Sequence, residues 1–283
     1  MVRNLILSAL MCASVIPVYG ADEMIFSCQV GSLEVHLLVE NRGQGRSSVL
    51  VGANQRALNQ YVPGGVYQSQ TNTFLIKNGS QAILIDTGFG TTVFESLSAL
   101  GLKPEDISAV LITHLHGDHI GGLARDGRAL FPQATVYLAQ QERDYWTRAN
   151  PNAGAVNALA AYPSRVEAFT PGELGAQVPE LLPGIRAFAA FGHTPGHTVY
   201  MVESQGQRLL IVGDLLHVED IQFPMPAVTV TYDTDQAAAA EARRRVLNYA
   251  AANALPIGGM HLRYPSVGLV QRSGNGYRFT PQQ

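Results

Sequence analysis

Apolar and polar positions along this 283-residue chain follow two periods, one typical of strands and one of helices. Residues 32–40 (SLEVHLLVE) alternate apolar and polar side chains, which predicts a half-buried strand. Residues 107–113 (ISAVLIT) are almost continuously apolar, as in a strand buried on both faces. Residues 235–254 (DQAAAAEARRRVLNYAAANA) consist mainly of strong helix formers. Strands interleaved with helices predict an α/β protein.

Turn signals and changes of composition bound the other predicted elements. The Asn78-Gly79 pair between two apolar runs predicts a hairpin. Residues 41–70 are rich in Gly, Gln, Asn and Ser and are expected to form a long loop, either a substrate lid or a dimer contact. An irregular connection is expected up to about Pro163. Further helices are expected at 91–100 and around 142–146, and further strands at 134–139, 184–190, 198–204, 207–214 and 255–260, with a hairpin at 266–281.

The N-terminal residues have the features of a signal peptide. Arg3 supplies a positive charge, residues 5–18 (LILSALMCASVIPV) form an apolar run, and small residues permit cleavage after Gly20 or Ala21. The apolar run is too short for a comfortable membrane span, which disfavours an uncleaved anchor. We therefore expect a signal peptide at 1–20 and a single mature domain at 21–283. This domain would be exported, periplasmic or secreted, without stable membrane association.

Composition and charge narrow the classes of function. The chain is 46% hydrophobic, enough for a large core, and its formal net charge is only −3. No basic patch with interleaved aromatic residues is present, so nucleic acid is not expected as a partner. After signal cleavage Cys28 would be the only cysteine, which excludes an intrachain disulfide. It lies in an apolar run and is interpreted as buried filler rather than as a nucleophile.

The segment THLHGDHIGG follows the apolar strand at 107–113 and concentrates chemically active side chains. His114, His116, Asp118 and His119 lie within six positions. Imidazole and carboxylate groups are ligands of Zn²⁺ and related divalent metals. The intervening Gly117 allows a tight turn, so that alternate side chains can converge. The sequence therefore predicts a metal site here rather than four solvated surface residues.

Four ligands are too many for one open catalytic zinc site and too few for two, so further ligands are expected later in the chain. His197, Asp214 and His261 each follow a predicted strand. A carboxylate that follows an apolar strand needs a partner to offset its desolvation. Each of these residues is ambiguous alone, but together they complete the set of ligands expected for the metal site.

This set of residues, in this order, resembles the metallo-β-lactamase-fold hydrolase superfamily. The resemblance includes IDTG at 85–88 and extends over nearly all of the expected mature chain. It is closest to the methyl parathion hydrolase-like and lactonase group, through residues 192–218 (GHTPGHTVYMVESQGQRLLIVGDLLHV) and 261–268 (HLRYPSVG). The resemblance implies a four-layer αββα sandwich, in which two mixed β-sheets are flanked by helices.

The resemblance also implies a ligand scheme for two divalent metal ions. His114, His116 and His197 would hold one ion. The other would be held by Asp118, His119 and His261. Asp214 would bridge the two ions together with a water or hydroxide. Zinc is the expected metal, although Mn, Fe or Co also fit a mixed set of histidine and carboxylate ligands.

Residues around the ligands are assigned less directly. Asp86 is expected to orient a ligand histidine, with capping of its own turn as the alternative. His193 is expected either to support the site or to make a structural hydrogen bond. The residues considered for the substrate pocket are Trp146, His217, Phe223 and Tyr264. For Trp146 a place in the core is the equal alternative.

The reaction implied is hydrolysis by a metal-bridging hydroxide that attacks a carbonyl carbon or phosphorus. Asp118 and Asp214 are the predicted catalytic residues, and Asp118 would move a proton to the leaving group. The expected substrate is a lactone or activated carboxylic ester, with phosphotriesters as a side activity. One alternative is a metallo-β-lactamase, which the family disfavours because its β-lactamases generally lack an Asp at the bridging position. The other is a non-catalytic periplasmic metal-binding module.

Overall fold

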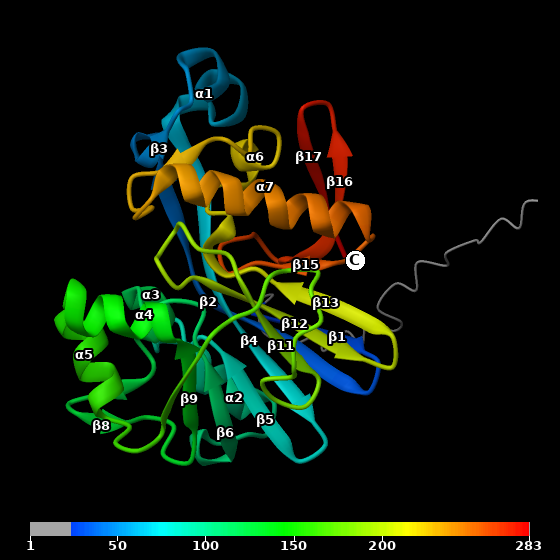
Figure 1. Ribbon diagram of the computed structural model, residues 1–283. Coiled ribbons are helices and arrows are strands. Elements are labelled where there is room, and N and C mark those ends of the chain that lie inside the picture. Colours follow the sequence, from blue (N-terminus) through cyan, green and yellow to red (C-terminus); the bar gives the residue numbers. More distant parts are fainter. Residues whose placement is uncertain (1–23, 283) are drawn as a thin grey trace, which may run out of the picture.

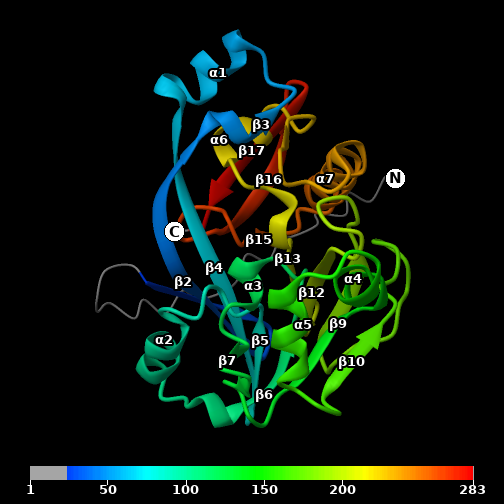
Figure 2. The ribbon, with the colours of Figure 1, turned by 90° about the vertical axis from the view of Figure 1, so that its left-hand side faces the viewer.

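The computed structural model describes residues 24–282, so the predicted signal peptide lies outside the described residues and stays a prediction. Two mixed sheets share a buried core at the centre of the molecule, and helices cover their outer faces (Figures 1 and 2). This arrangement confirms the predicted four-layer αββα sandwich. No helix within residues 24–282 has both the length and the apolar character needed to cross a membrane.

The first sheet has seven strands. In spatial order they are β1 (Ile25–Val30), β2 (Leu33–Arg46), β4 (Val66–Asn78), β5 (Gln81–Ile85), β6 (Ile107–Leu111), β9 (Thr135–Ala139) and β10 (Val166–Phe169). The first three pairings are antiparallel and include the predicted hairpin, in which Asn78 faces Gln81. From β5 to β10 the pairings are parallel. The carboxyl ends of β5, β6 and β9 therefore meet at one edge of the sheet.

The second sheet has six strands. In spatial order they are β11 (Ile185–Ala189), β12 (Thr198–Ser204), β13 (Gln207–Ile211), β15 (Ile257–Gly258), β16 (Val267–Ser273) and β17 (Gly276–Pro281). All pairings are antiparallel except that between β13 and β15. The parallel pair brings the residues that follow β13 and β15 to the same edge.

Helices cover the outer face of each sheet. The long helix α7 (Gln236–Ala252) packs Ala242, Val246 and Leu247 against the second sheet. Asp235 caps its N-terminus, where the Asp235 side chain accepts the Ala238 N–H (2.9 Å). The first sheet is covered by α2 (Val93–Ala99), α3 (Gly117–Ile120), α4 (Gln140–Asp144), the π-helical turn η4 (Tyr145–Ala149) and α5 (Ala153–Ala160).

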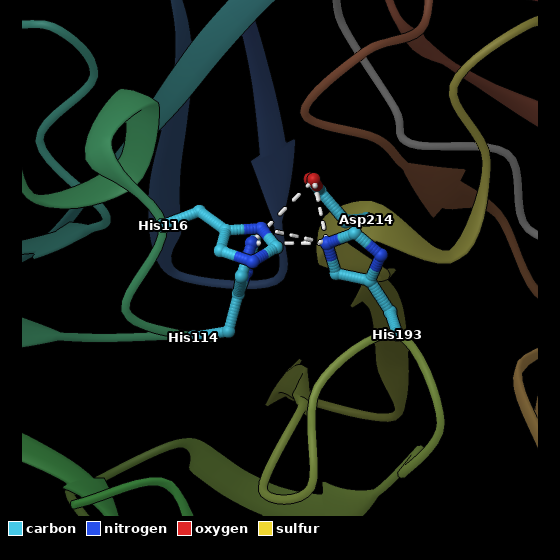
Figure 3. A group of neighbouring side chains, drawn as sticks. All are labelled: His114, His116, His193 and Asp214. Carbon is cyan, nitrogen blue, oxygen red and sulfur yellow. Dashed lines mark hydrogen bonds and ion pairs between the residues drawn. The ribbon is translucent and has the colours of Figure 1, made fainter. Parts of the chain in front are cut away.

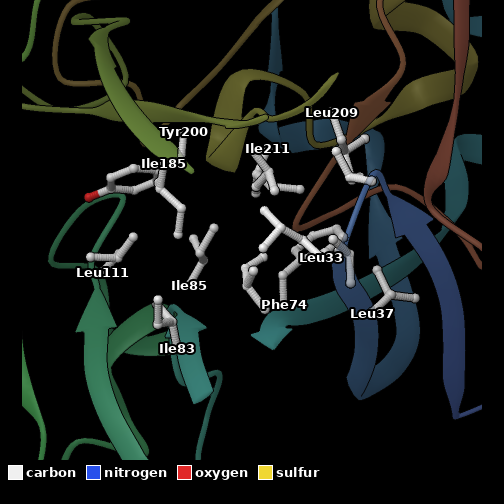
Figure 4. Close-up of a cluster of buried hydrophobic side chains, with 14 of the residues drawn as sticks. Leu33, Leu37, Phe74, Ile83, Ile85, Leu111, Ile185, Tyr200, Leu209 and Ile211 are labelled. Atoms are coloured by element: carbon white, nitrogen blue, oxygen red, sulfur yellow. The ribbon is translucent and has the colours of Figure 1, made fainter. Parts of the chain in front are cut away.

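The main core lies between the two sheets (Figure 4). Ile83, Ile85 and Leu111 of the first sheet share it with Ile185 and Ile211 of the second. Their side chains are at least 98% buried, and each such burial contributes about 1.5–3 kcal/mol relative to exposure. This core holds the two sheets together, and with them the strand ends that carry the predicted ligands.

The prediction of a long loop at residues 41–70 was wrong. Strand β2 continues to Arg46, which pairs with Val66 at the start of β4, so the two strands form a long arm. The arm carries α1 (Gln55–Tyr61), and its short strand β3 (Leu50–Val51) pairs with β14 (Thr229–Val230). The apolar pattern did not predict the strands of this arm, because their side chains are polar. Backbone pairing in a solvent-facing arm needs no apolar face. A dimer contact through this arm stays a prediction.

The irregular connection expected before Pro163 is also partly helical. Residues Ala153–Ala160 form α5, and the side chain of Asn152 caps the helix by accepting the Ala155 N–H (3.1 Å). Alanine is the strongest helix former and Asn a preferred N-cap, so both signals were present in the sequence.

Candidate metal centre

The predicted ligands follow the carboxyl ends of strands from both sheets. His114 follows β6, and the chain then turns into α3, which carries Asp118 and His119. Asp214 lies in η5 (Gly213–Leu215), directly after β13, and His261 follows β15. These strand ends meet at one edge of the sandwich, because the shared core aligns the two sheets. Residues far apart in the sequence are thereby brought together.

His114, His116, His193 and Asp214 form a first group of potential ligands (Figure 3). The His193 Nε2 atom lies 3.2 Å from His114 Nε2 and 3.1 Å from His116 Nδ1. Asp214 Oδ2 is 3.3 Å from His193 Nε2 and 3.5 Å from His114 Nε2. Three ring nitrogens and one carboxylate oxygen therefore converge on one point.

Asp118, His119 and His261 form a second group beside the first. The Asp118 Oδ2 atom lies 3.5 Å from His261 Nε2 and 3.8 Å from His119 Nε2. Asp214 lies between the two groups, since its Oδ1 is 3.0 Å from His119 Nε2 and its Oδ2 is 3.2 Å from His261 Nε2. One carboxylate thus faces both clusters, as a bridging ligand would.

His197 does not take its expected place among the ligands, which corrects the predicted set. Its Nε2 accepts the backbone N–H of Asp214 (2.9 Å), and its Nδ1 donates to the carbonyl oxygen of Ala190 (3.2 Å). Both ring nitrogens are therefore used by the backbone. His193, expected either to support the site or to make a structural hydrogen bond, points its Nε2 into the cluster instead. The role of His197 in the structure is to hold the turn that carries Asp214.

The residues present fit a pair of divalent metal ions. Among the described residues, the buried atoms His119 Nε2 and Asp214 Oδ1 have no hydrogen-bond partner, although they lie only 3.0 Å apart. A buried polar atom without a partner is costly, and a cation between a nitrogen lone pair and a carboxylate oxygen satisfies both. The donor set of imidazoles and carboxylates suits zinc and related metals.

Asp86 orients one of the histidines, as expected. Its Oδ2 lies 2.7 Å from His119 Nδ1, so it accepts that N–H and leaves Nε2 for the cluster. Its two oxygens also accept the backbone N–H (2.8 Å) and the hydroxyl (2.7 Å) of Thr113. Asp86 adopts a left-handed backbone conformation (φ 59°), which costs free energy for a non-glycine residue. These hydrogen bonds keep it there.

A second orienting carboxylate, Asp233, was not found in the sequence. Its Oδ1 lies 2.7 Å from His193 Nδ1, and its Oδ2 accepts the Val230 N–H (3.0 Å). The signal available was an acidic residue directly after the mostly β-branched run VTVTY at 228–232. His261 is oriented differently, because its Nδ1 donates to the backbone carbonyl of Gln70 (2.8 Å). In each case the ring presents Nε2 to the cluster.

Charge within the cluster shifts the pKa values of its members. Burial acts to raise the pKa of Asp214, but the surrounding imidazoles outweigh it and hold that pKa well below its usual range. Burial acts to lower the pKa of His193, but hydrogen bonds to Asp214 and Asp233 raise it to about 9. Burial, reinforced by His193, lowers the pKa of His116 to about 4. Asp214 is therefore ionised and His116 neutral at pH 7.

Two of the predicted pocket residues border the cluster. The ring of Trp146 meets that of His116 edge-on, with centroids 5.5 Å apart. His217 is buried, with its Nε2 3.0 Å from Asp214 Oδ2 and its ring stacked on His261 at 5.1 Å. A cavity of about 750 Å³ also borders His116 and extends between α3 and α5.

The other two residues considered for the pocket pack against aromatic side chains away from the cluster. Phe223 is 3% exposed and stacks on Phe279 at 5.2 Å, so it belongs to the core under α7. The ring of Tyr264 packs edge-on against Phe26 at 6.2 Å and beneath the Arg42 guanidinium. By contrast, Tyr232 was not predicted, yet it is 41% exposed and its ring lies 4.9 Å from that of His217.

The fold and the cluster agree with the comparison to known families. Residues 66–261 match the model of the Metallo-beta-lactamase superfamily, and the chain belongs to this superfamily. That range includes every residue of the two groups and ends at His261. The family resemblance inferred from the sequence is thus confirmed.

Individual relatives cover the chain to different extents. An atrochrysone carboxyl ACP thioesterase of Passalora fulva is 31% identical over 54% of this chain and 40% of its own length. A hydroxyacylglutathione hydrolase of Tolumonas auensis is 30% identical over 50% of this chain and 46% of its own. The chain therefore spans less than half the length of these curated relatives.

Solved structures share the fold over most of the chain. The hydrolase AbOPH of the beta lactamase superfamily is 26% identical, with a TM-score of 0.82 over 93% of this chain and 99% of that one. AidC, a dizinc quorum-quenching lactonase, has a TM-score of 0.80 over the same shares at 24% identity. The latter likeness concerns the fold alone.

Proposed function

We propose that this protein is a metal-dependent hydrolase that cleaves a carboxylic ester, with lactones and activated esters as its leading substrates. The observation that carries the proposal is Asp214, whose carboxylate lies within 3.5 Å of ring nitrogens in both groups of ligands. We assign His114, His116 and His193 to one metal ion and Asp118, His119 and His261 to the other, with Asp214 as the bridge. Zinc is the proposed metal.

Metal ions held in this way supply Lewis acidity and a water nucleophile at neutral pH. The protein's own residues have distinct tasks. Burial acts to raise the pKa of Asp118, but His119 and His261 outweigh it and lower that pKa, so Asp118 is ionised at pH 7. Its side chain is 26% exposed, which leaves it open to a substrate. Asp118 can therefore accept a proton from the attacking water and pass it to the leaving oxygen.

The class of substrate is supported by what the relatives share. The curated relatives named above are a thioesterase and a hydroxyacylglutathione hydrolase, and the fold neighbour AidC is a lactonase. Each of these names implies attack on an acyl carbon next to a leaving sulfur or oxygen. The cavity of about 750 Å³ beside His116 provides room for an acyl group. Phosphotriester cleavage stays a predicted side activity.

A turnover assay with a pH indicator tests the proposal. The zinc-loaded protein is compared on a lactone series, an aryl ester, a thioester, a cephalosporin and a methyl phosphotriester. We expect the lactones or activated esters to be cleaved fastest and turnover to be lost in Asp214→Asn. The matched control is Asp106→Asn, because Asp106 is an exposed residue at the opposite end of β6. Dominant cephalosporin turnover would instead identify a β-lactamase.

A further inference from the structure

Glu142 is a buried carboxylate for which the proposed reaction has no use. It lies in α4 with none of its surface exposed. A carboxylate can accept about four hydrogen bonds, and Glu142 accepts four, all from neutral donors. Burial raises the pKa of Glu142, and these hydrogen bonds oppose the rise. Such a costly arrangement calls for a reason in the surrounding structure.

The two oxygens of Glu142 serve two different segments. Its Oε1 accepts the backbone N–H of Leu115 (2.9 Å), the residue between His114 and His116, and the indole N–H of Trp146 (2.6 Å). Its Oε2 accepts the hydroxyl of Thr194 (2.7 Å), the residue after His193, and the backbone N–H of Gly196 (2.9 Å). One carboxylate therefore connects both loops that supply histidines to the first group.

The contact between α4 and the loop at 190–197 is also tight. A Cβ atom at Gly196 would lie 2.2 Å from the backbone nitrogen of Glu142 and 2.6 Å from its Cα. Only glycine permits this approach. The distance between the helix and the loop is thus set by backbone atoms, and the position of the carboxylate follows from it.

We propose that Glu142 is a positioning residue that sets the separation between His193 and the pair His114 and His116, and that orients Trp146 against His116. The inference rests on the proposed metal centre. The second group is held by other contacts, since Asp86 orients His119 and the Gln70 carbonyl orients His261. Loss of Glu142 should therefore weaken one metal site and leave the other intact.

Glu142→Gln is the sharpest variant, because it preserves shape and changes one oxygen into an NH₂ group. That group would face two donors, so the backbone N–H of either Leu115 or Gly196 must lose its acceptor. The matched control is Glu40→Gln. Glu40 is also buried and accepts several donors, among them the N–H groups of Thr91 and Thr92, but these lie before α2 and carry no ligand.

The test measures stepwise zinc binding by chelator competition, without substrate. We expect Glu142→Gln to weaken one of the two zinc-binding steps by about 10- to 100-fold and to leave the other step unchanged. In the control Glu40→Gln, both steps should be unchanged. Trp146 is the chain's only tryptophan, so its emission reports directly on the Glu142 contact. We expect zinc to change this emission in the wild type and to change it much less in Glu142→Gln.

Thr194→Val removes one of the four donors and provides a second measurement should Glu142→Gln fold poorly. It should weaken the same step by a smaller factor. Equal weakening of both steps, or two unchanged steps with an unchanged emission response, would overturn the proposal. Because no substrate is involved, a failure of the esterase assay does not affect this test.

Discussion

The Nδ1 atom of His193 lies 2.7 Å from Oδ1 of Asp233, although the two residues are 40 positions apart. This contact points the opposite ring nitrogen, Nε2, at His114, His116 and Asp214. His197 lies four residues further along the same segment and has both nitrogens on backbone groups. The choice between two histidines in GHTPGH is thus made by their hydrogen-bond partners.

This choice predicts opposite effects of two similar substitutions. His193→Ala removes a ligand, so the protein should bind one zinc ion tightly instead of two. His197→Ala leaves the N–H of Asp214 without its acceptor, so it should lower the free energy of unfolding by about 1–3 kcal/mol while two ions still bind. Zinc content by mass spectrometry and unfolding in urea measure the two effects. If His197→Ala lost a zinc ion and His193→Ala kept both, the assignment of His193 as the ligand would be contradicted.

Asp233→Asn tests the orientation of His193 without removing a ligand. The amide is a weaker acceptor and can present an NH₂ group to the imidazole, so zinc affinity should fall by about 10- to 100-fold. Zinc–chelator buffers at alkaline pH give the cleanest comparison, since protons compete least there. Asp235→Asn is the control, because Asp235 caps α7 and asparagine caps a helix equally well.

Zinc uptake at pH 7 should release a proton from His193. Its pKa is raised to about 9 by hydrogen bonds that outweigh burial, so the metal-free side chain carries a proton that zinc must displace. The pKa of His116 is lowered to about 4 by burial, so His116 should release none. Calorimetry in buffers of different ionisation enthalpy counts the protons, and heats independent of the buffer would argue against this prediction.

The same shift predicts how the stability of the metal-free protein depends on pH. A histidine pKa that rises on folding stabilises the protein fully below the unfolded value of about 6.5. That stabilisation is lost as pH rises through the folded value of about 9. Metal-free protein should therefore become less stable between these two pH values. Urea midpoints across this range measure the effect, and Asp233→Asn should flatten it.

Arg243 is predicted to be essential for the stability of the segment after Asp214. Arg243 is 1% exposed, and its guanidinium donates to the carbonyls of Leu215 (2.6 Å), Pro226 (3.1 Å) and Val228 (2.7 Å). Arg243→Leu would leave the carbonyls of Leu215 and Pro226 without this donor, while Val228 would keep only its hydrogen bond from Gln222. The change should lower the free energy of unfolding by about 2–4 kcal/mol.

The neighbouring Arg244 provides the control for this prediction. Its side chain is 45% exposed and pairs with the surface residue Glu241. Arg244→Leu should change the free energy of unfolding by less than about 0.5 kcal/mol. Thermal or urea unfolding of the two variants compares them directly, and equal losses would show that the three carbonyl contacts contribute little.

The apolar pattern predicted most of the sandwich, because buried strands carry their signal locally. The runs at 107–113 and 207–214 became β6 and β13, and Asn78-Gly79 became the expected turn. The arm formed by β2 and β4 was missed, since its strands are held by backbone pairing and carry polar side chains. Hydropathy reports burial of side chains and is silent about backbone hydrogen bonds.

The candidate site also has parts that the sequence predicted and parts that it did not. The clustering of His114, His116, Asp118 and His119 could be predicted from sequence, because these residues are close along the chain. The sequence also placed Asp214 and His261 at the ends of strands. The three-dimensional fold was needed to show that His193 faces the cluster in place of His197, and that Asp233 and Glu142 hold the ligand loops. A side chain's direction in a loop depends on hydrogen bonds to distant segments, which no local pattern encodes.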